Sequence, residues 1–176
     1  QNLFQCMKGV GPKDLSNLVI PVKSTGYVLC PVNCRKDRIE KDIVAMLTEA
    51  RNENKNSFLT YFVATDEQTS SWLTNVVGSD DTRILFVLQG LSSNTLYGYM
   101  GLAYADAEGR HIEGDAIVRY KKEAVPGLMR VAFTRLIEWV ISNLHFSEVR
   151  LRVLADNPAI HFYKNCGFTV IIEVPL

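Results

Sequence analysis

The order of apolar and polar positions predicts a chain that alternates short strands with amphipathic helices. Short runs rich in β-branched and aromatic residues predict strands, whereas apolar residues that recur every three or four positions predict helices. The strands are expected at residues 26–32, 83–89, 96–104, 111–120, 149–154 and 169–174, with a weaker one at 18–22. The helices are expected at residues 37–52, 65–77, 127–144 and 158–166. The apolar run 58–63 is expected to be a strand or an extended segment.

Two of these helices have a defined start or inner face. The apolar face of the helix at 37–52 comprises Ile39, Ile43, Leu47 and Ala50. Before the next helix, Thr65 and Gln68 have the spacing of a capping box, in which each side chain bonds the other residue's backbone N–H. The inner face of that helix is expected to comprise Trp72, Leu73 and Val76.

The end of the chain carries clear start and stop signals for a short helix. Asn157 is a suitable N-cap, and Pro158 fits the first turn because a backbone N–H would have no partner there. Gly167 can adopt the left-handed conformation that ends a helix, and Phe168 then opens a β-branched run. The C-terminal third is therefore predicted as helix, strand, short helix and strand.

The run VLADNPAIHFYKNCGF at residues 153–168 resembles the C-terminal signature of the GNAT acetyltransferases, DNPAxxFYxxxGF. The resemblance implies an α/β, GNAT-like three-layer fold, with a mixed, mostly antiparallel central sheet flanked by helices. It implies a GNAT-like acyltransferase domain over residues 26–176, preceded by an N-terminal extension or linker over 1–25. Because the chain begins with Gln1, it is also compatible with a place in a longer, multidomain chain.

The resemblance gives two residues of the signature a role. Tyr163 matches the tyrosine that lies near the thioester sulfur of acetyl-CoA and protonates the departing thiolate, and a phenol is a suitable general acid for this step. Asn157 matches an asparagine that contacts the CoA arm, a role compatible with helix capping. The structural alternative for Tyr163 is a tyrosine packed on the sheet with its hydroxyl bonded.

Glu113 is the candidate general base. It falls where histone-type members of the family keep a catalytic glutamate, and a carboxylate on a sheet face can take a proton from an ammonium group, directly or through water. His111 and Asp115 share its strand face by the two-residue period and compete for the role. A solvated strand-end glutamate is the structural alternative.

The strand that carries Glu113 is also expected to bind the donor. The resemblance implies that Ile117, Val118 and Arg119 lie where this strand separates from its neighbour. Exposed backbone groups there would pair with the pantetheine arm, and an N–H would polarise the thioester carbonyl.

The pyrophosphate loop departs from the family pattern. The residues expected to bind the donor here are Ala124, Val125, Gly127, Leu128 and Met129. The loop opens a helix whose N-terminal N–H groups hold phosphate. Gly127 matches the first glycine, but Ala124 replaces a Gln or Arg, Met129 replaces a small residue, and Pro126 lacks an N–H. Three outcomes stay open: an altered loop that binds acetyl-CoA, a different acyl donor, and loss of catalysis.

Composition and charge limit the classes of molecule that the protein is expected to bind. Among the 176 residues, 19 Lys and Arg balance 19 Asp and Glu, so the chain has no basic field for nucleic acid. No apolar run reaches the length of a membrane span and no signal-peptide pattern is present, so no membrane partner and a cytoplasmic location are expected. No metal site is expected, and the thiols are expected to be reduced, with a disulfide or metal as the alternative; they are Cys6, Cys30, Cys34 and Cys166.

The acceptor site implied by the resemblance lies opposite the donor, beside the first two helices. Its candidate lining residues, for which core packing is the alternative, are Trp72, Tyr97, Tyr99 and Tyr104. Tyr97 and Tyr99 are expected to share one strand face.

These observations predict an acyl-CoA-dependent N-acyltransferase. Its expected reaction transfers an acetyl group from acetyl-CoA to the amine of a small molecule, such as an amino sugar or an amino acid. The alternative is a non-catalytic GNAT-like ligand-sensing or interaction domain of a larger protein.

Overall fold

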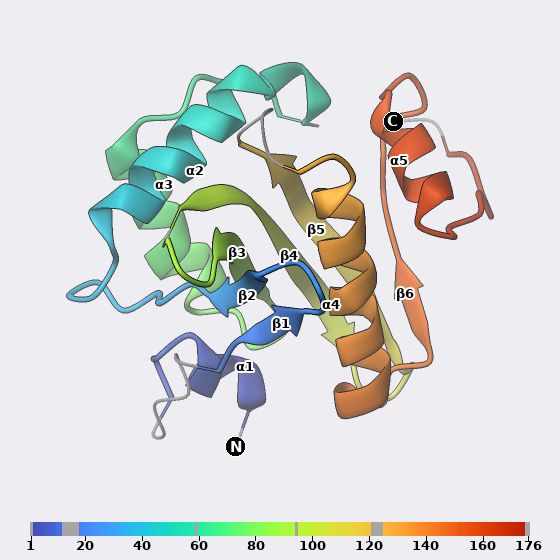
Figure 1. The fold of residues 1–176 in the computed structure, drawn as a ribbon, viewed down its shortest axis with the longest axis horizontal. Coiled ribbons are helices and arrows are strands. Elements are labelled where there is room, and N and C mark those ends of the chain that lie inside the picture. Colours follow the sequence, from blue (N-terminus) through green and yellow to red (C-terminus); the bar gives the residue numbers. More distant parts are fainter. Residues whose placement is uncertain (1, 12–17, 59, 94, 121–124, 175–176) are drawn as a thin grey trace.

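Figure 1 shows the fold in the computed structural model, which describes residues 2–11, 18–58, 60–93, 95–120 and 125–174. Within these residues, one sheet of six strands has the order β1-β2-β3-β4-β5-β6. The strands are β1 (Ile20–Val22), β2 (Tyr27–Pro31), β3 (Ile84–Gly90), β4 (Leu96–Asp106), β5 (His111–Arg119) and β6 (Glu148–Arg150). Neighbouring strands are antiparallel except β5 and β6, which are parallel. The predicted mixed, mostly antiparallel sheet is confirmed.

Helices cover both faces of this sheet. They are α1 (Leu3–Met7), α2 (Lys41–Glu53), α3 (Asp66–Trp72), α4 (Leu128–Leu144) and α5 (Ala159–Asn165), with a 3₁₀ turn η1 (Lys55–Ser57) and a π-helical turn η2 (Leu73–Val77). In Figure 1, α2 and α3 lie on one side of the sheet, and α4 and α5 lie on the other. The three-layer arrangement expected from the sequence is therefore present.

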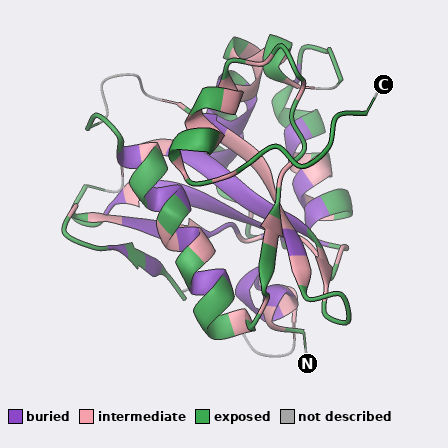
Figure 2. Cartoon of the chain, turned by 90° about the vertical axis from the view of Figure 1, so that its right-hand side faces the viewer, coloured by how far each residue is buried: buried purple, intermediate pink, exposed green. Residues whose placement is uncertain are grey.

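Two apolar clusters bury the sheet, one on each face. Phe86 of β3 belongs to the cluster under α4, whereas its neighbours Leu85 and Val87 belong to the cluster under α2 and α3. Figure 2 shows the buried residues concentrated in the strands and on the inner faces of the helices. Because full burial of one such side chain contributes roughly 1.5–3 kcal/mol, this alternation fixes which residues of each strand face each helical layer.

Helix α2 begins at Lys41, later than the predicted Asp37, so Ile39 of the predicted inner face precedes the helix, whereas Ile43, Leu47 and Ala50 are buried as predicted. Residues 36–38 form a turn instead. The Asp37 carboxylate accepts a hydrogen bond from Nε of Arg35 at 3.4 Å, a local contact that competes with helix formation. Glu40 is the N-cap and has an extended backbone.

The capping box before α3 is confirmed, but the helix changes its period before it ends. Thr65 and Gln68 exchange both capping hydrogen bonds. In η2 the N–H of Gly78 bonds the carbonyl of Leu73 at 2.8 Å, five residues earlier. This wider turn shifts the phase of the inner face, so Val77 is buried and Val76, which was expected inside, is 42% exposed.

The described parts of residues 1–25 pack on the rest of the domain. Helix α1 buries Phe4 and Met7, and the weakly predicted strand is confirmed as β1. The Lys8 side chain is fully buried, and its Nζ donates to the carbonyls of Val77 and Asp80, each at 2.7 Å. Burial lowers the pKa of Lys8. The boundary between residues 25 and 26 stays a prediction.

The strand predicted at 169–174 is wrong. None of these residues pairs with a described strand, and all six are exposed. Ile171 is 77% exposed, and Figure 2 shows the whole run as exposed chain. Their β-branched residues favour a strand only where a neighbouring strand offers backbone partners, and β6 ends at Arg150, short of the predicted 154.

The described residues of the apolar run, 58 and 60–63, form no strand, which leaves the extended segment as the remaining expectation. The guanidinium of Arg51 on α2 holds it, with its Cζ 4.4 Å from the ring centroid of Phe58 and 3.9 Å from that of Phe62. The same group donates to the carbonyl of Thr60 at 2.8 Å. The Arg51 side chain therefore provides contacts to this segment that a neighbouring strand would otherwise provide.

Irregularities in the strand register change which side chains share a face. A register shift between Leu88 and Gln89 puts Tyr97 in the cluster under α4 and Tyr99 in the cluster under α2 and α3. The expectation that these two tyrosines share a face is therefore wrong. A second shift lies in β5 at Ala116, which has a left-handed φ of 50°.

Candidate active site

The parallel strands β5 and β6 separate after a short stretch of pairing. Their register covers only His111 with Glu148, Ile112 with Val149, and Glu113 with Arg150. Beyond these pairs, β5 continues to Arg119 while the chain after β6 leaves the sheet. We call this separation, between residues 114–119 of β5 and residues 151–154, the splay. Along it, no described strand pairs with the outer edge of β5.

Tyr163 lies on α5, on the α4 side of the splay. Its ring packs edge-on against Phe133 and Phe168, with centroids 6.3 and 6.4 Å apart. Burial raises its pKa to about 12, helped by Cys166 and by the negative charge of Asp115 on β5. The phenol is therefore protonated at neutral pH, as a general acid must be.

Helix α5 ends as the sequence predicts, but it begins at Ala159 with Pro158 in the N-cap position that was expected for Asn157, and Asn157 bonds the start of the helix from one residue earlier. Oδ1 of Asn157 accepts a hydrogen bond from the Ala159 N–H at 2.9 Å. The N–H of Gly167 bonds the Lys164 carbonyl and that of Phe168 bonds the Tyr163 carbonyl, with Gly167 at φ 93°. These contacts fix the orientation of the helix that carries Tyr163.

The two carboxylates predicted on β5 both lie on the face toward α2 and α3. Glu113 accepts a hydrogen bond from Nε of Arg152 at 2.8 Å, and Asp115 accepts one from Nη1 of Arg83 at 3.1 Å. His111 lies apart from them, beside Asp106 at 3.6 Å in the turn before β5. Of the three candidate bases, only Asp115 has a charge that raises the pKa of Tyr163.

The predicted donor-binding residues of β5 lie along the splay. The bulge at Ala116 sets their directions, so Ile117 packs toward α4 and Val118 is buried on the α2 side. Arg119 is exposed and pairs through its backbone with Gly98 of β4. The opposite backbone edge of these residues is available to an extended ligand.

The helix expected to hold phosphate is α4. Ala124 lies outside the described residues, and Val125 is exposed. Gly127 is the N-cap with φ 79°, no side chain caps the helix, and its first turn has no acidic residue. Leu128 and Met129 instead point into the apolar cluster under α4. What remains for an anion is a set of backbone N–H groups at the positive end of the helix dipole.

The other candidate residues have packing roles. Burial raises the pKa of the Cys166 thiol and that of the Tyr99 phenol. Tyr97 packs edge-on against Tyr27, with centroids 4.8 Å apart. Trp72 packs against the cluster under α2 and α3.

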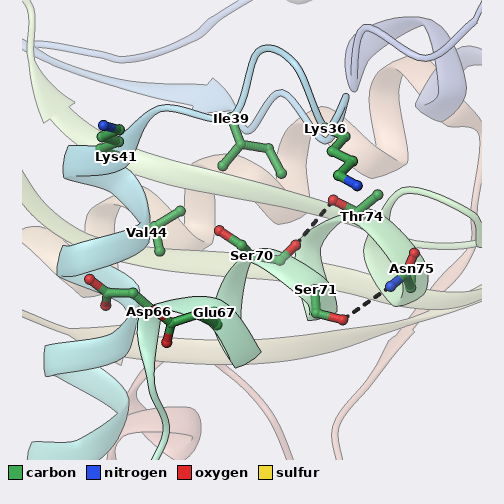
Figure 3. Close-up of a pocket in the computed structure, with 10 residues that line it drawn as sticks. All are labelled: Lys36, Ile39, Lys41, Val44, Asp66, Glu67, Ser70, Ser71, Thr74 and Asn75. Carbon is green, nitrogen blue, oxygen red and sulfur yellow. Dashed lines mark hydrogen bonds between the residues drawn. The ribbon is translucent and has the colours of Figure 1, made fainter.

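A groove of about 650 Å³ lies between the start of α2 and the outer face of α3. Figure 3 shows it bordered by Lys36 and Lys41 on one side and by Asp66 and Glu67 on the other, with hydroxyl side chains between them. It shares no lining residue with the splay. Its opposite charges balance, so its chemistry selects no single class of ligand.

Two arginines at the site were missed from the sequence. Arg83 and Arg152 bind Asp115 and Glu113, and each stacks on Tyr104. The two-residue period of a strand at 149–154 places Arg150 and Arg152 on one face. Only the structure shows which of the two binds Glu113.

The described residues contain no group of three or more His, Cys, Asp or Glu side chains arranged to hold a metal ion. Within the same residues, no helix is long and apolar enough to cross a membrane.

The comparison with family models finds one match. The acetyltransferase (GNAT) domain matches residues 37–169, three quarters of the chain. A comparison with curated protein sequences finds no match.

Several solved structures share the fold. Spermidine N-acetyltransferase from Vibrio cholerae, in complex with CoA and spermine, is 19% identical, covers 83% of this chain and 82% of its own, and has a TM-score of 0.66. RimL, a ribosomal L7/L12 alpha-N-protein acetyltransferase in complex with coenzyme A, is 13% identical over 86% of this chain and 84% of its own, with a TM-score of 0.70. FdhC, a nucleotide-linked sugar GNAT, is 14% identical over 85% and 82%, with a TM-score of 0.67.

Proposed function

Because the chain belongs to the GNAT acetyltransferase family, we propose that it transfers an acetyl group from acetyl-CoA to the amine of a small molecule such as an amino sugar or an amino acid. The observation that carries this proposal is the half-buried Tyr163 on α5, whose ring packs on Phe133 and Phe168 and whose pKa is raised by burial and by the charge of Asp115 on β5. The proposed acid therefore belongs to the same region as residues 114–119 of β5, whose outer edge pairs with no described strand.

The donor fits two features of the structure. The unpaired edge of β5 along Ile117, Val118 and Arg119 offers backbone donors and acceptors to a pantetheine arm, as an added strand would use them. The N-terminus of α4 at Gly127 offers uncapped N–H groups to a pyrophosphate. Asn157, which starts α5, is proposed to contact the CoA arm as well.

The reaction needs two proton transfers. The acceptor nitrogen attacks the thioester carbonyl carbon, a C–N bond forms, and the C–S bond breaks. Tyr163 donates its phenol proton to the leaving thiolate, and a carboxylate on β5 takes a proton from the acceptor nitrogen, directly or through water. A backbone N–H of β5 stabilises the oxyanion. Holding both substrates together lowers the entropic part of the barrier.

Two carboxylates compete for the role of base. Glu113 is the proposed base, and only its Oε2 is engaged by the Arg152 hydrogen bond. Asp115 is the second candidate, because its charge reaches Tyr163 and that of Glu113 does not. If Glu113 is the base, Glu113→Gln lowers kcat and Asp115→Asn leaves most of it; the reverse result assigns the role to Asp115.

The first test is calorimetric titration with acetyl-CoA, CoA and dephospho-CoA. We expect micromolar binding, about −8 kcal/mol, because the α4 N-terminus keeps its backbone donors despite the altered loop. Amines are then screened for acetylation with acetyl-CoA. No binding of any of the three compounds, together with no turnover, would contradict the proposed donor.

The proposal also includes what the enzyme needs and where it works. It has no metal requirement and binds no nucleic acid and no membrane. It works in the cytoplasm and can be part of a longer multidomain chain. Activity that survives a chelator, and a chain that stays in the supernatant when membranes are sedimented, are the expected results.

A further inference from the structure

An exposed tyrosine is held between two arginines at the base of the splay. The Tyr104 ring centroid lies 5.5 Å from Cζ of Arg83 and 4.8 Å from Cζ of Arg152. The backbone of Tyr104 is left-handed, with φ 53°, and the residue is 49% exposed. Such a conformation is strained for a bulky residue and marks positions fixed by their surroundings.

Each arginine is also paired with a carboxylate of β5. Arg83 binds Asp115 and Arg152 binds Glu113. We call these five residues the Tyr104 cluster. Its two positive and two negative side chains are paired with one another, so the exposure and the uncommitted hydrogen-bonding groups of its members decide what it can bind.

Arg152 is the member of the cluster that keeps binding capacity. Its side chain is 63% exposed, whereas that of Arg83 is 14% exposed. A guanidinium has five N–H donors, and one hydrogen bond, from Nε, joins Arg152 to Glu113. The planar arrangement of the remaining donors matches the oxygens of a carboxylate or a phosphate.

The position of Arg152 relates it to the proposed acceptor site. Glu113 is the last residue of β5 that pairs with β6, and Arg152 follows that pairing by two residues. The Arg152–Glu113 contact thus crosses the point where the splay begins. Asp115, whose charge reaches Tyr163, is two residues further along β5, roughly 7 Å for extended chain.

We infer that the Tyr104 cluster binds an anionic group of the acceptor, with Arg152 as the principal donor. The acceptor is then an amine that also carries a carboxylate or a phosphate, and it binds with its amine toward Asp115 and Tyr163. This inference rests on the proposed function and narrows its acceptor class. Tyr104 acts as a positioning residue that keeps the Arg152 guanidinium flat.

Matched acceptors test the inference. Initial rates with saturating acetyl-CoA are compared for γ-aminobutyrate, butylamine and putrescine, and for glucosamine with and without its phosphate. We expect kcat/KM at least about tenfold higher for the anionic member of each set, mainly through KM. The two sets distinguish a carboxylate from a phosphate as the preferred anion.

The variants Arg152→Gln and Arg150→Gln make a matched pair. Arg150 is exposed and binds Glu148 at 2.8 Å, outside the cluster. Arg152→Gln is expected to lower the ratio of anionic to neutral kcat/KM by about tenfold, and Arg150→Gln to leave it unchanged. Using this ratio removes any effect on Glu113 as a base, because such an effect applies to every acceptor.

The outcomes separate this inference from the proposed function. Acetylation of amines without preference for an anion, or a preference for putrescine, overturns the inference and leaves the proposed function standing. Absence of turnover with every amine contradicts the proposed function. In that case, calorimetric titration with glucosamine phosphate tests the anion site directly. Weaker binding to the Arg152→Gln variant than to the unsubstituted protein supports the site, and equal binding to the two proteins overturns it.

Discussion

The side-chain amide of Asn157 joins α5 to the connection between α2 and α3, because its Nδ2 donates to the Ser57 carbonyl at 3.2 Å. Its Oδ1 at the same time accepts from the Ala159 N–H. One residue of the C-terminal signature therefore positions the helix of Tyr163 and ties it to the helical layer on the other face of the sheet.

Replacing Asn157 separates these two contacts. Asn157→Ala removes both and is expected to lower the free energy of unfolding by about 1 kcal/mol, as loss of a helix cap does. Asn157→Asp keeps a side-chain oxygen that accepts from the Ala159 N–H. It replaces the Nδ2 donor by an oxygen, so the hydrogen bond to the Ser57 carbonyl is lost. Urea unfolding measures both variants. If they lose the same stability, the cap is not the larger contribution.

Removing the phenol of Tyr163 tests the general acid. Tyr163→Phe keeps the aromatic packing on Phe133 but has no proton to give, so kcat is expected to fall by about 100-fold or more. Stability should change by no more than about 0.5 kcal/mol. Tyr27→Phe, on β2, is the control and should keep full activity. A Tyr163→Phe enzyme with normal kcat excludes the role.

Stability is expected to fall as the pH rises above 9. Burial raises the folded-state pKa of the Cys34 thiol from 9.0 to about 12, and that of Tyr163 from 10.0 to about 12. A raised pKa stabilises the folded state below the unfolded-state value, and this stabilisation is lost as the pH rises toward the folded-state value. Each group contributes a slope of about −1.4 kcal/mol per pH unit in its window.

Urea unfolding at a series of pH values from 8 to about 11 measures these slopes. Cys34→Ala removes one titrating group, so its curve should be flatter than that of the unsubstituted protein from pH 9 upward. Parallel curves for the two proteins would show that the Cys34 thiol titrates equally in the folded and unfolded chain.

The left-handed backbone of Ala116 is a site where strain can be tested. Ala116→Val is expected to lower the free energy of unfolding by about 1–3 kcal/mol, because a β-branched side chain fits poorly at φ 50°. Ala116→Gly should be neutral or slightly stabilising, since glycine adopts this conformation freely. A valine variant as stable as the glycine variant would mean that the bulge rearranges.

Local signals in the sequence were sufficient for much of the fold. The capping box at Thr65, the Asn157 bond to the Ala159 N–H and the left-handed Gly167 depend on neighbouring residues alone, and all are present, although the N-cap of α5 is Pro158. The strand at 169–174 failed for the opposite reason: its propensity was correct, but strand formation depends on a partner edge elsewhere in the chain. The π-helical turn that exposes Val76 leaves no signal in the apolar pattern.

The site shows the same limit. Tyr163, Glu113 and Asp115 are identifiable from one motif and one strand, and the charge of Asp115 contributes to the raised pKa of Tyr163. Tyr104 lies in β4, whereas Arg83 precedes β3 and Arg152 follows β6, so their contacts depend on how the sheet brings these three segments together. The roles proposed for these residues stay predictions until activity is measured.

The extra residue in β5 determines which face of the sheet each later side chain of this strand points to. Between two neighbouring register pairs, Gly101 with Asp115 and Tyr99 with Val118, β4 advances two positions and β5 advances three. Asp115 and Val118 therefore point to the same layer, although an odd spacing normally separates them. Deleting Ala116 alone should exchange the directions of Ile117 and Val118, which would invert the two walls of the splay without changing the identity of any remaining side chain.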